Sequence, residues 1–340
     1  MIKVNWSLLS KYRTTLMGFA IMWVMYFHIG IQSYNDFVWF FHRIGFYGVD
    51  IFLFLSGIGV YFSLKKRPKV SGFYKARLSR ILPAYIIVAT VAYLLLRLEN
   101  GSIGDFLVYI SGIGYWTRQS RFDWYIPTQM LFYLLTPLFL LFYNKLSKEN
   151  RTGYTIACMS ASLFLCLVLY YTDCTYLWGS AVRLAIFLLG IHTGSYVEEK
   201  RKISKGDLCV AVSMFLVGTL LSFFTHKHLS NPSYIMQGLN AYPALLMMPS
   251  FCFLTSCLLG KLEEKFSKTV SVVSFPFNLM GKYSLELYLL HQQLQKILPK
   301  YFNIDNQIII VAVTILFAVA LGKIISTVKY LFKERRKSKK

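Results

Sequence analysis

The feature that most constrains the fold is a series of apolar runs, each close to twenty residues long. A helix of that length crosses the hydrocarbon core of a bilayer, about 30 Å thick, because each residue adds about 1.5 Å. Charged residues make up only 15% of the chain, against about 25% in soluble domains. The runs therefore predict an all-α, polytopic integral membrane protein with about ten transmembrane helices. The predicted spans are residues 14–31, 46–63, 81–97, 122–143, 154–171, 177–197, 207–224, 241–259, 275–295 and 308–329.

Lysine and arginine are distributed unequally between the two predicted faces of the membrane. If the N-terminus is cytoplasmic, the segments on that side carry 27 of the 37 basic residues, whereas the segments on the other side carry seven. Short cytoplasmic loops are enriched in Lys and Arg. We therefore expect a multi-pass protein of the cell membrane with both termini in the cytoplasm.

The net charge of +22 does not indicate nucleic-acid binding, because the basic residues are spread over six short segments. One of these, the C-terminal tail 330–340, is expected to be attracted to anionic membrane lipid. The six cysteines have no CxxC spacing and predict neither a metal site nor a disulfide framework. No cleavable signal peptide is expected, so the first span should remain in the mature protein. The chain, residues 1–340, is expected to form a single transmembrane domain.

Polar side chains from five separate spans fall near the predicted outer surface. His28 lies near the outer end of the first span, and Asp50 lies near the start of the second. Ionisable groups are costly in lipid and usually face a bundle interior or a wet cavity. Their common depth favours a functional site over a scatter of hydrogen bonds. The other polar residues of this set are Gln129, Arg183 and His291, with Glu286 nearer the middle of the membrane.

His28 and Asp50 are the nearest histidine and carboxylate in sequence and depth. A carboxylate that fixes the imidazole tautomer lets the other ring nitrogen take a proton from an attacking hydroxyl. The same pair could instead be a structural contact between the first two spans. Glu286 and His291 are five residues apart, off the spacing of three or four that brings helical side chains together, so they need not face each other.

The loop after the second span carries Arg77 and Arg80 on what should be a helix entering the third span. At a spacing of three they share one face, where two guanidinium groups could bind a phosphate. Topology alone explains basic residues in this loop. It does not explain an arginine pair at helical spacing.

Several of these stretches together carry a family resemblance. They are MGFAIMWVMYFH ending at His28, GVDIFLFLSG at 48–57, FYKARLSRILPAY at 73–85, WYIPTQMLFYLLTPLFL at 124–140, RLAIFLLG at 183–190 and GKYSLELYLLHQ at 281–292. In this order they resemble the signature blocks of the acyltransferase family 3 membrane proteins. The resemblance implies about ten transmembrane helices. It also implies transfer of acyl groups, mostly acetyl, from cytoplasmic acyl-CoA to cell-surface or secreted carbohydrates.

The resemblance also implies roles for individual residues. His28 matches the catalytic histidine of the first span, and Arg77 and Arg80 match the basic pair expected to meet the donor's phosphates. Asp50 belongs to the second-span block. Trp124 and Arg183 match the fourth and sixth blocks, with roles that the resemblance leaves open.

Two positions depart from the family pattern. Met17 stands where members usually have an arginine, eleven positions before the histidine. Arg13 lies one turn earlier, but helical side chains lean toward the N-terminus, so it should point away from that position. Arg13 could serve the donor end by another geometry. Gln129 stands where many members have a glutamate, so it keeps hydrogen-bonding capacity without charge.

Residues and resemblance together predict a membrane O-acetyltransferase. His28, oriented by Asp50, would act as general base or as transient acyl carrier. Acetyl-CoA, or another acyl-CoA, would be held at the cytoplasmic side, and the acceptor would be a carbohydrate or glycolipid. The oligomeric state is not predicted. The donor contacts are Arg77, Arg80 and Arg13, and the other buried polar candidates are Trp124, Gln129, Arg183, Glu286 and His291.

Two alternatives remain at this stage. A transporter or flippase for a lipid-linked sugar could use the same polar groups as a pathway, although we find no clear inverted repeat. A member of the family that has lost activity would explain Met17 and Gln129. It should bind acyl-CoA weakly and form no product.

Overall fold

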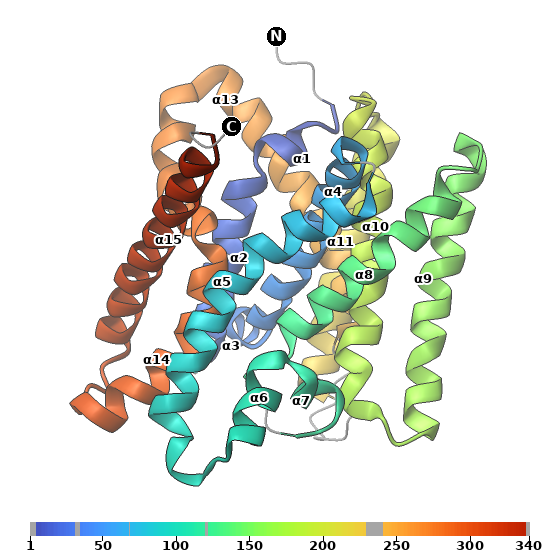
Figure 1. Ribbon diagram of the computed structural model, residues 1–340. Coiled ribbons are helices and arrows are strands. Elements are labelled where there is room, and N and C mark those ends of the chain that lie inside the picture. Colours follow the sequence, from blue (N-terminus) through green and yellow to red (C-terminus); the bar gives the residue numbers. More distant parts are fainter. Residues whose placement is uncertain (1–4, 31–34, 68, 120–121, 229–240, 338–340) are drawn as a thin grey trace. The chain divides into compact units, whose positions relative to one another are not determined.

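The computed structural model describes residues 5–30, 35–67, 69–119, 122–228 and 241–337 (Figure 1). These residues are almost entirely helical, which confirms the all-α prediction. Eight helical segments among them are long and apolar enough to cross a membrane. The long helices are α2 (Arg13–His28), α4 (Gly48–Lys66), α5 (Val70–Leu96), α8 (Tyr125–Tyr143), α9 (Lys148–Tyr171), α10 (Trp178–Glu198), α11 (Lys205–His228), α13 (Pro243–Lys282), α14 (Ser284–Phe302) and α15 (Gln307–Lys337).

The chain divides into two compact units. The first unit comprises Met1–Phe73 and Thr128–Gly281, and the second comprises Tyr74–Pro127 and Lys282–Lys340. The first therefore holds α2, α4, α9, α10, α11 and α13 with most of α8, and the second holds most of α5 with α14 and α15. The predicted site residues are consequently described unit by unit.

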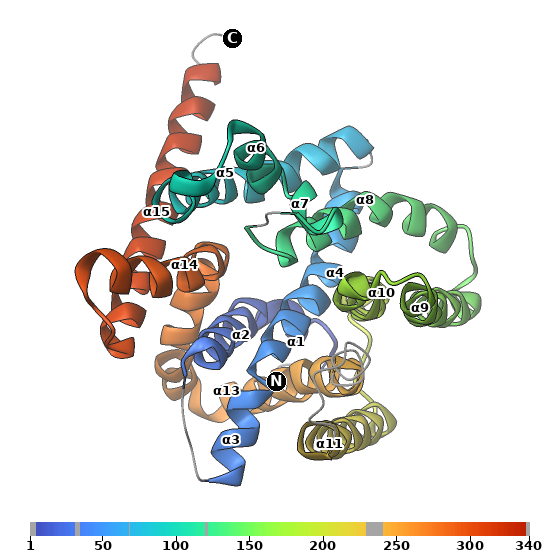
Figure 2. The same ribbon diagram turned by 90° about the horizontal axis from the view of Figure 1, so that it is seen from below.

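Within the first unit, α4 lies between α2 and α10 (Figure 2). A Cβ on Gly57 would stand 2.3 Å from the Phe187 carbonyl oxygen, and a Cβ on Gly190 would stand 2.2 Å from that of Phe54. The α4 and α10 backbones therefore touch directly, as small residues allow in membrane helices. Seven residues before each of these glycines, Asp50 pairs with Arg183. This matched offset means that α4 and α10 run side by side in the same direction.

The structure around α13 refines one prediction and corrects another. The predicted loop 260–274, between the spans 241–259 and 275–295, contains the non-helical bend of α13 at Phe266 (φ −132°, ψ 50°), with helix on both sides of it. The predicted ninth span, 275–295, is wrong, because α13 ends at Lys282 and α14 begins at Ser284. A Cβ on Gly281 would stand 1.9 Å from the Thr14 carbonyl oxygen, so the end of α13 packs directly on the backbone of α2. The apolar run continues across this break. Hydropathy therefore does not reveal it, because hydropathy carries no information on which helix a residue packs against.

Two shorter helices lie in the segment of the second unit that follows α5 and precedes α8. These are α6 (Ile103–Ser111) and α7 (Ile113–Trp116). Ser102 and Asp105 form a capping box that starts α6. Tyr109 of α6 is buried against Ala89 and Tyr93, so this segment folds back on the end of α5.

Candidate active site

Helix α2 places His28 at its C-terminal end, half-buried. Its Nδ1 lies 2.9 Å from the carbonyl oxygen of Val24, one turn earlier in the same helix. A carbonyl oxygen only accepts hydrogen bonds, so Nδ1 carries the proton of the neutral ring. The basic lone pair of His28 is therefore on Nε2, the nitrogen that could accept a proton from a hydroxyl.

Asp50 is fully buried on the first turn of α4, and its ion-pair partner is Arg183. The Nε of Arg183 lies 3.1 Å from Oδ1 of Asp50. A buried carboxylate requires a compensating charge, and a buried arginine on the adjacent helix supplies it. The observed contacts pair Asp50 with Arg183 and the imidazole of His28 with the backbone carbonyl of Val24. That Asp50 orients His28 stays a prediction.

Further polar groups surround this ion pair within the first unit. The hydroxyl groups of Tyr47 and Ser222 lie 3.1 Å apart, and Nδ1 of His226 lies 2.8 Å from the Ser222 carbonyl oxygen. On the other side, Nη1 of Arg183 donates to the Gly179 carbonyl oxygen at 3.2 Å. Sequence reasoning missed Tyr47, Ser222 and His226. The only signal for the last two was a serine and a histidine four residues apart in an apolar run.

Gln129 is buried on α8, as we predicted for the polar residues of the membrane spans. Its neighbour Thr128 forms a hydrogen bond of 2.6 Å with Ser180 of α10. One turn farther along α8, the hydroxyl of Tyr133 lies 3.1 Å from that of Ser56 on α4. These contacts make the interface between α8 and the α4–α10 pair polar.

At the beginning of α2, Arg13 lies against α4. Its Nη2 stands 3.1 Å from the point that a Cβ on Gly59 would occupy, and its Nε donates to the Leu55 carbonyl oxygen at 3.4 Å. The absence of a side chain at Gly59 thus makes room for the guanidinium. Met17, one turn later, is half-buried.

The predicted donor arginines lie in the second unit. Both Arg77 and Arg80 are on α5, three residues apart, which confirms the helical spacing on which the prediction depends. Arg77 is half-buried and Arg80 is exposed.

On α14, His291 is buried and Glu286 is half-buried. Nδ1 of His291 lies 2.6 Å from the carbonyl oxygen of Tyr288, so its basic nitrogen is also Nε2. Tyr288 in turn donates from its hydroxyl to Asp123 at 2.8 Å. Asp123 also caps α8 by accepting from the backbone N–H of Ile126. Trp124, beside Asp123, is half-buried.

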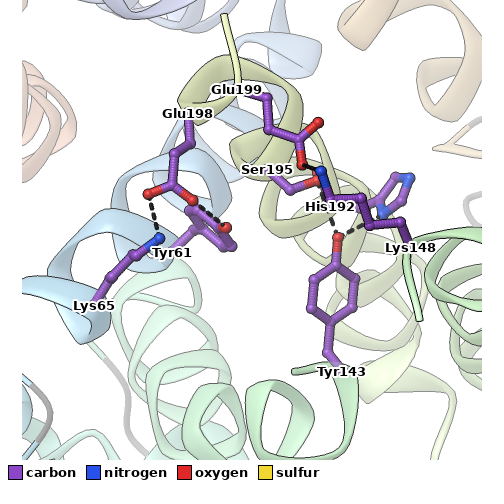
Figure 3. Close-up of polar contacts among 8 residues, drawn as sticks. All are labelled: Tyr61, Lys65, Tyr143, Lys148, His192, Ser195, Glu198 and Glu199. Carbon is purple, nitrogen blue, oxygen red and sulfur yellow. Dashed lines mark hydrogen bonds and ion pairs between the residues drawn. The ribbon is translucent and has the colours of Figure 1, made fainter. Parts of the chain in front are cut away.

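A separate polar cluster gathers where α4 and α10 end (Figure 3). The Tyr143 hydroxyl donates to Ser195 at 3.1 Å and lies 2.9 Å from Nδ1 of His192. Figure 3 shows these side chains together with two acidic residues at the end of α10, which bind lysines on α4 and α9. The acidic pairs are Glu198 with Lys65 and Tyr61, and Glu199 with Lys148. These contacts connect α4, α8 and α9 to the end of α10.

Near the start of α2, Tyr12 donates from its hydroxyl to Glu263 of α13. Burial, reinforced by the Glu263 carboxylate, raises the pKa of Tyr12 above its ordinary value. Lys11 pairs with the same carboxylate at 2.6 Å. Within the described part of the chain, no group of three or more His, Cys, Asp or Glu side chains could hold a metal ion.

Comparison with known proteins identifies the family. The acyltransferase-domain family matches residues 15–327, nearly the whole chain. No curated protein and no solved structure gives a significant match. Together with its apolar helices, the match assigns the chain to acyltransferase family 3, as a multi-pass membrane acyltransferase.

Proposed function

We propose that the protein transfers an acetyl group from cytoplasmic acetyl-CoA to a hydroxyl of a cell-envelope carbohydrate or glycolipid. Membership of the family supports acyl transfer. The observation that carries the proposal is the hydrogen bond from Nδ1 of His28 to the Val24 carbonyl oxygen. This hydrogen bond places the basic lone pair of the imidazole on Nε2, which would then act as the general base or the nucleophile.

In the first form of the reaction, Nε2 of His28 takes the proton of the acceptor hydroxyl as its oxygen attacks the thioester carbonyl. The tetrahedral intermediate expels the CoA thiolate, which receives the proton from the imidazolium. The products are an acetyl ester and CoA. In the second form, Nε2 attacks the thioester carbonyl and expels the CoA thiolate. The acceptor hydroxyl then attacks the acetylated histidine, its proton passes to the thiolate, and the imidazole is regenerated.

Arg77 and Arg80 are proposed to bind the phosphates of CoA. Both charges are on one face of α5, and arginine matches phosphate geometry by donating two parallel hydrogen bonds. Arg13 would add positive charge at the start of α2. Acyl chains longer than acetyl would use the same phosphate contacts.

The acceptor is proposed to meet buried polar side chains. In the first unit these are Gln129 and the Asp50–Arg183 pair, which are all buried. In the second unit they are His291, which is buried, and Glu286 and Trp124, which are half-buried. Hydroxyl-rich ligands need such hydrogen-bonding groups, because a wholly apolar site would leave their hydroxyl groups unsatisfied.

The donor would enter from the cytoplasm, with both termini on that side. Ion pairs within the first unit support this orientation. Lys11, Lys65 and Lys148 pair with carboxylates where α2 and α9 begin and α4 ends. Lysine and arginine at one end of a bundle are typical of its cytoplasmic face.

Substitution of His28 tests the proposal. Membranes containing His28→Ala, supplied with labelled acetyl-CoA and the host's envelope glycans, should lose transfer by about 10²-fold or more, because both forms of the reaction need Nε2. His28→Gln should also be inactive, although it can donate a hydrogen bond. Both variants should insert normally. Full transfer by either variant would refute the role of His28.

Mass spectrometry of surface glycans tests the acceptor class. Cells with the gene should carry glycans heavier by one acetyl group than cells without it, and His28→Ala cells should match the latter. Movement of a lipid-linked sugar without CoA, and with unchanged glycan masses, would instead establish a transporter.

A further inference from the structure

A short helix that the apolar runs did not predict covers the end of α2. This helix, α3 (Asp36–Arg43), begins at Asn35, whose side chain accepts hydrogen bonds from the backbone of Phe37 and Val38. In its last turn, Nε2 of His42 lies 2.7 Å from the carbonyl oxygen of Ile29. Since the carbonyl accepts, His42 carries its proton on Nε2 and donates it. Ile29 is the residue that directly follows His28.

The last turn of a helix is where such a bond has most effect. The final carbonyl groups of a helix lack partners within the helix, and the end frays unless other groups bind them. Ile29 has extended dihedral angles (φ −81°, ψ 123°) and ends α2. His42 therefore binds a carbonyl group that α2 itself leaves unsatisfied, immediately beside the His28 backbone.

A second hydrogen bond runs in the opposite direction. Nε1 of Trp23 on α2 donates to the carbonyl oxygen of Phe41 at 2.9 Å, one residue before His42. The rings of Trp23 and Phe41 stack with centroids 5.1 Å apart, and the His42 ring meets the Tyr26 ring edge-on at 5.1 Å. Each helix thus donates a side-chain hydrogen bond to the backbone of the other. We call this the α2–α3 hydrogen-bond pair.

We propose that His42 is a positioning residue that fixes the last turn of α2 and so holds the ring of His28 in place for acyl transfer. The inference rests on the proposed function of His28. The ring of His28 bonds to Val24 in the same turn, so its direction depends on that turn staying helical. Displacing a reacting group by about 1 Å costs up to 10²-fold in rate. Loss of the His42 bond should therefore lower kcat and leave substrate affinity unchanged.

Two substitutions at position 42 separate this role from simple packing. His42→Leu introduces an apolar side chain of similar size and removes the donor. His42→Gln keeps an N–H donor at a similar reach. In purified protein reconstituted in nanodiscs, His42→Leu should lower kcat about tenfold, with KM for acetyl-CoA within about twofold of the wild type. His42→Gln should restore most of kcat.

A matched control and a second variant complete the test. Phe37 lies on the same helix and is 74% exposed, so Phe37→Leu should leave kcat unchanged. If His42→Leu does not fold, Trp23→Phe removes the other hydrogen bond of the pair while keeping an aromatic ring. It should lower kcat in the same way. Wild-type kcat in both His42→Leu and Trp23→Phe would overturn the proposal, as would equal losses in His42→Leu and His42→Gln.

A measurement without acyl transfer keeps the inference separate from the proposed function. Diethyl pyrocarbonate modifies neutral imidazole nitrogens, and peptide mass spectrometry reports the rate at His28 alone. His42→Leu should change that rate at least threefold, whereas His42→Gln and Phe37→Leu should not. If the wild type transfers no acetyl group, the proposed function fails, yet this rate still decides whether His42 holds His28. An unchanged rate in His42→Leu would refute the positioning role.

Discussion

Asp50 and Arg183 form an ion pair inside the first unit, where the loss of either partner leaves a buried charge. Removing one member of such a pair destabilises a protein by about 3–5 kcal/mol, while removing both costs much less. Asp50→Asn and Arg183→Gln should therefore each lower the midpoint of thermal unfolding in detergent. The double variant should unfold at a higher temperature than either single variant.

The double-mutant cycle also tests the pairing of Asp50 with Arg183. If Asp50 acted on His28 instead, the effects of Asp50→Asn and Arg183→Gln on stability would simply add. Thr15→Ala serves as a control on α2. Thr15 is only half-buried, lies near the start of α2, far from His28, and donates a hydrogen bond to Asn278 of α13. Its effect should be small and additive with that of Asp50→Asn.

Single residues show where sequence reasoning succeeds and where it stops. The burial of Asp50, Gln129 and Arg183 could be predicted, because a polar residue in an apolar span must avoid lipid. The partner of Asp50 could not, because the contact with Arg183 depends on how closely α4 approaches α10. His42 was missed for a similar reason, since its proposed role comes from contact with a carbonyl group 13 residues earlier in the chain.

At the scale of helices, the contact between α4 and α10 requires glycine on both sides. A Cβ at Gly190 would stand 2.2 Å from the Phe54 carbonyl oxygen, so the helices must separate to admit a side chain. Gly190→Val should destabilise the protein by about 1–3 kcal/mol, the usual cost of overpacking. The loss of stability is measured by following the helical circular dichroism signal during heating in detergent.

A glycine in open space supplies the matched control for that substitution. Gly153 lies on α9, and nothing within 4 Å would meet a Cβ added there. Gly153→Ala should therefore stabilise the protein by about 0.5–1 kcal/mol, because glycine is a poor helix former. Equal losses from Gly190→Val and Gly153→Ala would contradict the close approach of α4 and α10.

Helix positions could be predicted far better than helix ends. Apolar length alone placed α4, α8 and α10 within a few residues, because a lipid-embedded run has few alternatives to a helix. The break between α13 and α14 was missed because Gly281 is required there by contact with Thr14, which is distant in sequence. The helix α3 was missed because eight residues carry too little periodic signal.

At the scale of the whole molecule, the family match extends over residues of both compact units, from 15 to 327. The residues proposed for the donor and the acceptor are likewise drawn from both. His28, Asp50 and Arg183 belong to the first unit, and Arg77 and Arg80 belong to the second. Neither unit alone therefore carries the full set of residues that the proposed reaction uses.

The orientation of the molecule in the membrane is tested by labelling the two ends of α9. Asn144 is exposed just before that helix, and Tyr171 is 83% exposed at its other end. With 27 of 37 basic residues on the predicted inner side, the positive-inside rule places Asn144 in the cytoplasm and Tyr171 outside. In a background with the six native cysteines replaced, a membrane-impermeant maleimide should label Tyr171→Cys in intact cells and leave Asn144→Cys unlabelled. Both should react after permeabilisation, and the reverse pattern in intact cells would place the proposed donor arginines on the wrong side for cytoplasmic acetyl-CoA.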